Sequence, residues 1–226
     1  HPVTREIEQR LAAIIFRWER LPVDMVVEPF YAVQYVVQST GVGMEEIKSE
    51  IPHDADGGMT AKHYDCQIKE LADIEKIRPP VLTYDADATA AKAAVVSGLI
   101  GDLLPVRTVG VTHHNYAPWD RLAEWWNPQE VLMALAMDPD MVHAAMDRLC
   151  TAYMSELDQL EGMGLLSLGT GNFVVGQGGM GFTGDLPGAG AEPQPARLAD
   201  QWGGAMAQIF SEVSPDMHEE FALAYE

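Results

Sequence analysis

The sequence predicts an α/β protein built on a parallel sheet. Short apolar runs such as "VRTVGVT" (residues 106–112) and "LLSLG" (165–169) have the length and composition of buried strands. These runs alternate with helix-like segments of about ten residues or more, which is the pattern of repeated strand–helix units. The chain shows no internal repeat with a period of about 20 to 50 residues, which argues against a solenoid.

Three long segments have the periodicity of amphipathic helices. Apolar residues recur every three or four positions over residues 4–21, 87–104 and 138–161. Asp138 suits the N-cap of the last helix and Pro139 its first turn, while Pro105 ends the second helix. Shorter helices are predicted at residues 32–40, 66–77, 121–126 and 214–225.

Extended segments and turns are expected between these helices. The segment "DMVVEPF" (residues 24–30) is predicted to be a short buried strand, and residues 44–52 are predicted to be extended or loop-like. "DADGG" (54–58) has turn chemistry and does not match the ligand spacing of a calcium loop. We expect a single domain over residues 1–226, with a surface loop at 184–197.

The charge balance excludes several classes of partner. The chain has 34 acidic and 14 basic residues, a formal net charge of -20, which opposes binding to nucleic acid and to anionic membrane surfaces. No run reaches the roughly 20 apolar residues of a membrane helix. Cys66 and Cys150 are the only cysteines, so no disulfide framework is expected and a cytoplasmic location is predicted.

The two ends of the sequence suggest a longer protein. The chain opens at His1 without an initiator methionine, and it stops at Glu226 inside a helical pattern. We therefore expect it to be a piece of a larger polypeptide.

Two segments carry side chains suited to chemistry. In "GVTHHNYAPWD" (residues 110–120), His113 and His114 follow an apolar strand, and in a continuing strand they would point to opposite faces. One of them is expected to face a ligand, and a metal ion shared by both is not expected. Glu28 lies at the carboxyl end of the strand predicted at residues 24–30, and α/β barrels keep their reactive groups at such strand ends. Glu28 is therefore a candidate functional residue. The alternative is a structural role, as a helix cap or a hinge carboxylate beside Pro29.

Other motifs are incomplete. The glycine-rich tract at residues 169–190 matches neither the dinucleotide-binding fingerprint nor a Walker loop. It is predicted to be a flexible or ligand-covering loop with Asn172 and Gln177 as polar contacts. Ser167 lacks the G-x-S-x-G elbow of a serine hydrolase. His63 and Cys66 are spaced like two zinc ligands, but no second pair accompanies them.

Four further segments stand out in order along the chain: "LPVDMVVEPFYAVQYVVQSTGVGMEEI", "RTVGVTHHNYAPWDRLAEWW", "DPDMVHAAMDRLCTAYMSELDQLEGMG" and "DQWGGAMAQIFSEVSPDMHEEFALAYE". Together they resemble the uroporphyrinogen decarboxylase superfamily, which includes corrinoid-dependent methyltransferases. The third segment is similar to the family's "DPELVHALLDKLT" helix and the fourth to its "QIFDSWAG-LSPEDFEEFVLPY" segment. The resemblance implies a (β/α)8 TIM-type barrel, incomplete in this chain, with ligands at the carboxyl ends of its strands.

The resemblance also implies an activity. We expect corrinoid-linked methyl transfer on a small-molecule substrate, with zinc and a corrinoid present in the full-length protein and the corrinoid carried by a partner protein. No motif in these residues binds either cofactor. The catalytic candidates are Glu28, His113 and His114. The candidate substrate contacts are Tyr31, Asn115, Trp119, Asn172 and Gln177.

Departures from the family pattern separate its activities. The decarboxylases carry an "RQAGR" segment, which this chain lacks, and an Asp in an "FSD" motif, near which Tyr31 stands here. The substrate of the decarboxylases carries many carboxylates, and binding it requires clustered arginines. The net charge of -20 on this chain does not favour binding of such a substrate. The methyltransferases bind zinc through a His-x-Cys motif that lies later in the barrel than these residues. Two alternatives stay open: a decarboxylase-like lyase with a different substrate, and a non-catalytic binding partner of a corrinoid protein.

Overall fold

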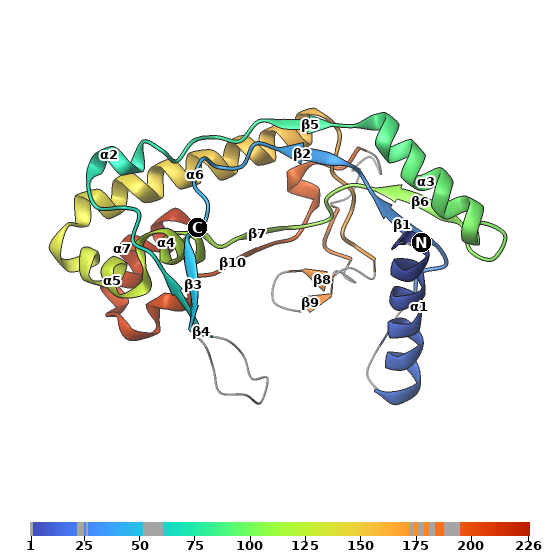
Figure 1. The fold of residues 1–226 in the computed structure, drawn as a ribbon, viewed down its shortest axis with the longest axis horizontal. Coiled ribbons are helices and arrows are strands. Elements are labelled where there is room, and N and C mark those ends of the chain that lie inside the picture. The colour runs from blue at the N-terminus through green and yellow to red at the C-terminus, as the bar shows by residue number, and fades with distance from the viewer. Residues whose placement is uncertain are drawn as a thin grey trace. The chain divides into compact units, whose positions relative to one another are not determined.

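The computed structural model describes residues 2–21, 25, 27–51, 61–171, 174–175, 179–180, 184–187 and 195–226. It contains both helices and strands, as predicted, and the described strands pair two at a time (Figure 1). The chain forms two compact units. Unit 1 comprises residues 1–38, 83–114 and 160–202, and unit 2 comprises residues 39–82, 115–159 and 203–226. Among the described helices, none has both the length and the apolar composition needed to cross a membrane.

Unit 1 is organised around a parallel strand pair. β1 (Tyr31–Gln34) pairs in parallel with β6 (Val106–Val109). α3 (Ala86–Ile100) precedes β6 in the chain and packs against both strands (Figure 1). Two parallel strands covered by a helix agree with the expected mixed α/β class, although β1 lies where a helix was predicted.

A third segment continues the parallel order beside β6. Val111 and Leu166 form a parallel bridge, in which the Val111 amide donates to the Leu165 carbonyl and the Ser167 amide donates to the Val111 carbonyl. Gly110 permits this close approach, because a Cβ atom at that position would lie 2.0 Å from the Leu165 oxygen. The strand predicted at residues 165–169 is thus reduced to one bridge.

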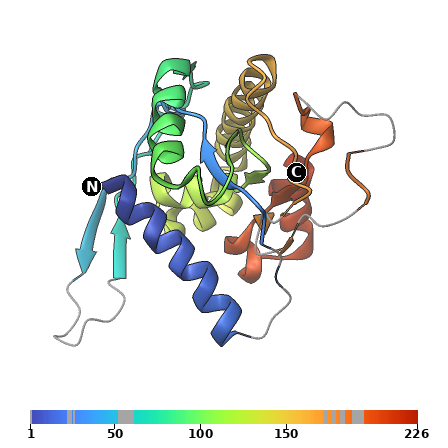
Figure 2. The same ribbon diagram turned by 90° about the vertical axis from the view of Figure 1, so that its right-hand side faces the viewer.

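The first helix packs on the strand pair through its N-terminal half. α1 (Pro2–Arg20) buries Ile7 in a cluster with Tyr31, Val33 and Val96. Its C-terminal half exposes large apolar side chains, including Phe16 and Trp18. Figures 1 and 2 show that this end of α1, in dark blue, projects away from β1.

Unit 2 is mainly helical. It contains α4 (Pro118–Trp126), α5 (Pro128–Met137), most of α6 (Pro139–Gly162) and α7 (Pro215–Phe221). These helices enclose an apolar core that includes Trp119, Leu122, Trp125, Val131, Met146, Leu149 and Phe221.

Short strand pairs and turns complete the described fold. β3 (Lys48–Ile51) pairs with β4 (Ala61–Tyr64) in antiparallel orientation. The other pairs are β2 (Val37–Ser39) with β5 (Leu82–Tyr84), β7 (His114–Tyr116) with β10 (Gly203–Ala205), and β8 (Val174–Val175) with β9 (Gly179–Met180). Single turns form α2 (Leu71–Ile74) and the 3-10 segments η1 (Leu198–Asp200), η2 (Gln208–Glu212) and η3 (Leu223–Tyr225).

Several local predictions are wrong. Residues 32–40 do not form a helix but contribute to β1 and β2, because Val33, Val36 and Val37 suit strands and the backbone of β1 finds its partners in β6. The strand predicted at residues 24–30 is absent from the described residues 25 and 27–30, since the ladder starts where the Tyr31 amide donates to the Pro105 carbonyl. The helix predicted at residues 66–77 is limited to Leu71–Ile74, and α5 was not predicted at all.

Candidate functional site

Buried polar side chains gather at the carboxyl ends of the parallel strands in unit 1. Thr112 follows β6 and Ser167 follows the bridge residue Leu166, and both are less than a tenth exposed. Because parallel strands end at the same edge, these two residues are neighbours there. Gln201, from the turn after η1, reaches the same edge and is 6% exposed.

Gln201 ties the two strand ends together. Its Nε2 atom donates to the Val111 carbonyl and to the Ser167 carbonyl, both at 2.6 Å. Since both partners are acceptors, the amide group has only one orientation, and Oε1 points away from them. That oxygen is buried and accepts no hydrogen bond from the described residues. Nearby, the Gly110 amide donates to Ser167 Oγ at 2.8 Å.

Gly169 allows the third segment to stay close to β6 beyond the bridge. A Cβ atom on Gly169 would lie 2.2 Å from the Thr112 carbonyl oxygen, which is far inside van der Waals contact. Only glycine therefore fits here without moving the backbone. At this edge the two strand ends lie close together and are joined by hydrogen bonds.

The structure distinguishes the two histidines at this edge. His113 Nδ1 lies 3.2 Å from Thr112 Oγ1 and shares a hydrogen bond with it. His114 is half-buried, and its Nδ1 atom is buried with no partner among the described residues. Burial, with a smaller contribution from His113, lowers the pKa of His114 below its ordinary value. His114 thus has a buried imidazole nitrogen without a partner among the described residues, and burial disfavours its protonated form.

The other predicted contacts beyond β6 belong to unit 2 or lie outside the described residues. Asn115 is exposed in β7. Trp119 is 1% exposed, donates from Nε1 to the Phe221 carbonyl at 2.9 Å, and packs edge-on against Phe210. It is part of the core of unit 2. Asn172 and Gln177 are among the residues that the structure does not describe.

Glu28 and Tyr31 lie at the opposite end of the strand pair. Because β1 begins at Tyr31, Glu28 precedes the strand, and the expectation that it sits at a carboxyl end is wrong. A strand of this length spans about 10 Å at roughly 3.3 Å per residue. Glu28 and the histidines therefore cannot act on the same small group.

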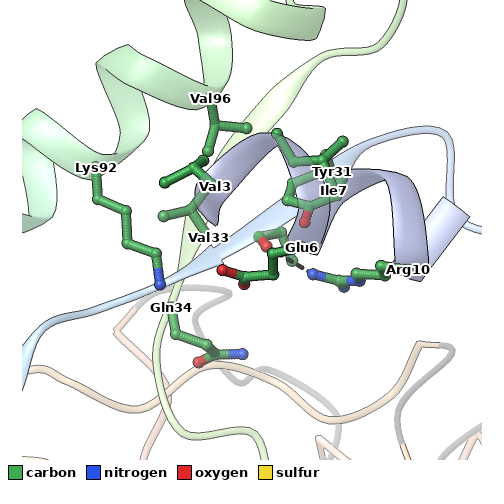
Figure 3. A pocket seen from close by; sticks show the side chains of 10 residues that line it. Val3, Glu6, Ile7, Arg10, Tyr31, Val33, Gln34, Lys92 and Val96 are labelled. Atoms are coloured by element: carbon green, nitrogen blue, oxygen red, sulfur yellow. Dashed lines mark hydrogen bonds between the residues drawn. The ribbon is translucent and has the colours of Figure 1, made fainter. Parts of the chain in front are cut away.

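The structure brings Glu28 and Tyr31 together in a cavity of about 320 Å³. Its lining comes from α1, from the segment before β1, from the start of β1 and from Leu104 between α3 and β6. Arg10 lies between this cavity and a smaller one of about 50 Å³, shown in Figure 3. The described residues thus offer two separate places for ligands, one at each end of the strand pair.

Several of these residues were not predicted from the sequence. Gln201 and Arg10 have no motif around them, and their partners are far away in the chain. Gly110 and Gly169 could have been found from the sequence. Gly110 interrupts an apolar run and Gly169 ends one, and a glycine in such a place indicates that another backbone lies close by, as it does here.

A metal site is not found in the described part of the chain. No group of three or more His, Cys, Asp or Glu side chains there could hold a metal ion. His63 Nε2 lies 3.9 Å from Asp65 Oδ1, and Cys66 Sγ donates to the Ile68 carbonyl, so neither points to a shared site with the other.

Comparisons with known proteins give no relative from which a function could be transferred. No family model, no curated protein and no solved structure matches the chain. The superfamily resemblance of the four segments therefore stays an expectation from the sequence.

Proposed function

We propose that this chain is part of a (β/α)8 barrel of the uroporphyrinogen decarboxylase superfamily and that the protein performs corrinoid-linked methyl transfer on a small substrate. The four sequence segments support the family. The observation that carries the proposal furthest is the parallel order of β1, β6 and Leu166, with buried polar groups at the shared carboxyl edge. Barrels of this type place their reacting groups at that edge.

The proposed roles follow from the geometry of the edge. Gln201 holds the ends of the two strands in register, so it is a positioning residue. His114 offers a neutral imidazole nitrogen that can donate or accept a hydrogen bond to substrate. His113, tied to Thr112, completes the polar surface. A pre-arranged edge of this kind lowers the cost of orienting a small substrate.

Among the described residues at this edge, no set of side chains fits the zinc ion that the family implies. The polar groups there are hydroxyls, an amide and two histidines, without the thiolates of a zinc site with sulfur ligands. When bound, the corrinoid supplies the cobalt that carries the methyl group. We assign no step to either cofactor in these residues.

The activity can be tested with the full-length polypeptide. Methylcobalamin is added with a thiol or an amine acceptor, and the visible spectrum is followed for demethylation. The proposal predicts a protein-dependent loss of the methylcobalamin spectrum. No spectral change with any acceptor contradicts it; consumption of uroporphyrinogen would then favour the lyase alternative, and no reaction with either would favour a binding partner.

Two matched variants locate the site. His114→Phe is expected to reduce the rate at least about tenfold, the low end of the effect of a positioned hydrogen-bonding group. Glu28→Gln is expected to leave the rate unchanged, because Glu28 lies at the other end of β1. If Glu28→Gln abolishes activity and His114→Phe does not, the reaction takes place elsewhere than at the carboxyl edge.

A further inference from the structure

The cavity beside β1 lies at the amino end of the strand pair, away from the edge assigned to methyl transfer. Most of its wall is apolar and comes from three parts of unit 1. The apolar lining consists of Leu11, Ile14, Ile15, Val27, Phe30 and Leu104. Its volume of about 320 Å³ is room for about ten non-hydrogen atoms, counting roughly 30 Å³ for each as for liquid water. This is the lower end of the size range of small-molecule sites.

Arg10 supplies a fixed cation at this cavity. Its Nη1 atom donates to the Ala32 carbonyl at 3.0 Å, and its guanidinium lies over the Tyr31 ring, 4.6 Å from the ring centroid. Figure 3 shows Arg10 and Tyr31 from the side of the smaller cavity, with the bond to Ala32 dashed. The two contacts hold the guanidinium in place and use one of its five N–H donors. In the described part of the chain, Arg10 forms no ion pair.

Two carboxylates lie near Arg10. Glu28 lines the cavity but already has an interaction of its own. Glu6 lies one turn before Arg10 and lines the smaller cavity instead. The positive charge next to the apolar wall is increased by Arg107, whose guanidinium lies over the Phe30 ring at 4.5 Å.

We propose that this cavity is a binding site for an apolar carboxylic acid of about ten non-hydrogen atoms. The apolar body lies against α1, Phe30 and Leu104, and the carboxylate accepts hydrogen bonds from the remaining N–H groups of Arg10. A planar guanidinium held from two sides matches a carboxylate well, and little ordering is needed when the acid binds.

Three probes of nearly equal size test the head-group preference. Octanoate, octanol and octylammonium are titrated, below their aggregation limits, into full-length protein with isotope-labelled methyl groups. The methyl signals of Leu11, Ile14, Val27 and Leu104 should shift with octanoate and saturate, while those of Ile68 and Val131, in unit 2, stay fixed. Octanoate should bind about tenfold more tightly than octanol, and octylammonium most weakly. Absence of saturable shifts, or equal or tighter binding of octylammonium, overturns the proposal.

Variants separate the head-group contact from the cavity. Arg10→Gln should lower octanoate affinity about tenfold and leave octanol affinity unchanged, as expected for one charge-assisted contact. Arg17→Gln, on the same helix but outside the lining, should change neither. Leu104→Trp keeps Arg10 and fills the space, so it should abolish binding of both probes. Unchanged octanoate binding in Leu104→Trp, with methyl signals of a folded protein, would place the acid elsewhere.

Binding of an acid in this cavity does not depend on the reaction proposed above. Octanoate binding is measured from the shifts of methyl signals, without any reaction, and methylcobalamin demethylation is measured from the visible spectrum in the absence of octanoate. Failure of one measurement therefore leaves the other standing.

Discussion

Gln201 connects two strand ends through a single amide group. Its two N–H donors are both used by strand carbonyls, and its own oxygen stays buried without a partner among the described residues. The side chain therefore holds the two strand ends together through its donor group.

Replacing Gln201 tests how much the bridge contributes. In Gln201→Met the Ser167 carbonyl loses its Gln201 donor, while the Val111 carbonyl keeps the Ser167 amide. We expect the free energy of unfolding to fall by about 1 to 2 kcal/mol, measured from urea unfolding. Gln67→Met is the control, because its side chain makes one exposed bond, to the Glu45 carbonyl, and its loss should cost less. An equal loss in both variants would mean that Gln201 has no special role at the edge.

His114 makes stability depend on pH. Its pKa is lowered in the folded chain, chiefly by burial, from an unfolded value of about 6.5. Between those two pKa values the unfolded chain binds the proton more readily than the folded one. The stability is thus fully present above the unfolded pKa, falls as the pH is lowered toward the folded pKa, and then levels off.

The pH prediction is checked by comparing variants. Urea unfolding from pH 7.5 to pH 5 should show a smaller loss of stability in His114→Phe than in the wild type. His113→Phe should keep most of the wild-type loss, because burial, the larger cause of the lowered pKa of His114, remains in that variant. If His114→Phe has the wild-type slope, then its imidazole is not shielded in the folded protein.

At the scale of the elements, glycine positions fix how closely strands approach. A Cβ atom on Gly169 would clash with the Thr112 carbonyl oxygen at 2.2 Å. Gly98, inside α3, is the control position, because nothing lies within 4 Å of a Cβ atom there. Gly169→Ala should therefore destabilise the protein by about 1 to 3 kcal/mol. Gly98→Ala should stabilise it by about 0.5 to 1 kcal/mol, because alanine is the better helix former. Thermal unfolding measures both, and stabilisation by Gly169→Ala would contradict the close approach at the edge.

The three long helices were the elements that the sequence predicted best. The segments predicted at 4–21, 87–104 and 138–161 correspond to α1, α3 and α6 within a few residues. Ser214, at the start of the segment predicted at 214–225, does cap α7 by accepting from the Met217 amide. Periodicity and caps act within one or two turns, so a local sequence contains them.

At the scale of the whole molecule, the net charge of -20 is spread over 226 residues. Repulsion among like charges destabilises the folded state and is screened by salt, with a Debye length of about 30 Å at 0.01 M and about 10 Å at 0.1 M. We expect the melting temperature at pH 7 to rise between these salt concentrations. The rise should nearly vanish near pH 4.5, the isoelectric point. An equal rise at both pH values would assign the effect to the salt itself and not to screening.

The sequence by itself determined the mixed α/β class, the long helices and the histidine pair at the end of a strand. Only the tertiary structure decided that residues 32–40 hold strands, that Glu28 precedes β1, and that Gln201 joins two strand ends. A helix satisfies its backbone within its own sequence, so local patterns predict it. A strand takes its hydrogen-bond partners from a distant segment, and the chain between β1 and β6 includes β2 to β5, α2 and α3. The end of the sheet at which a side chain lies is therefore known only after the partner strand and its direction are known.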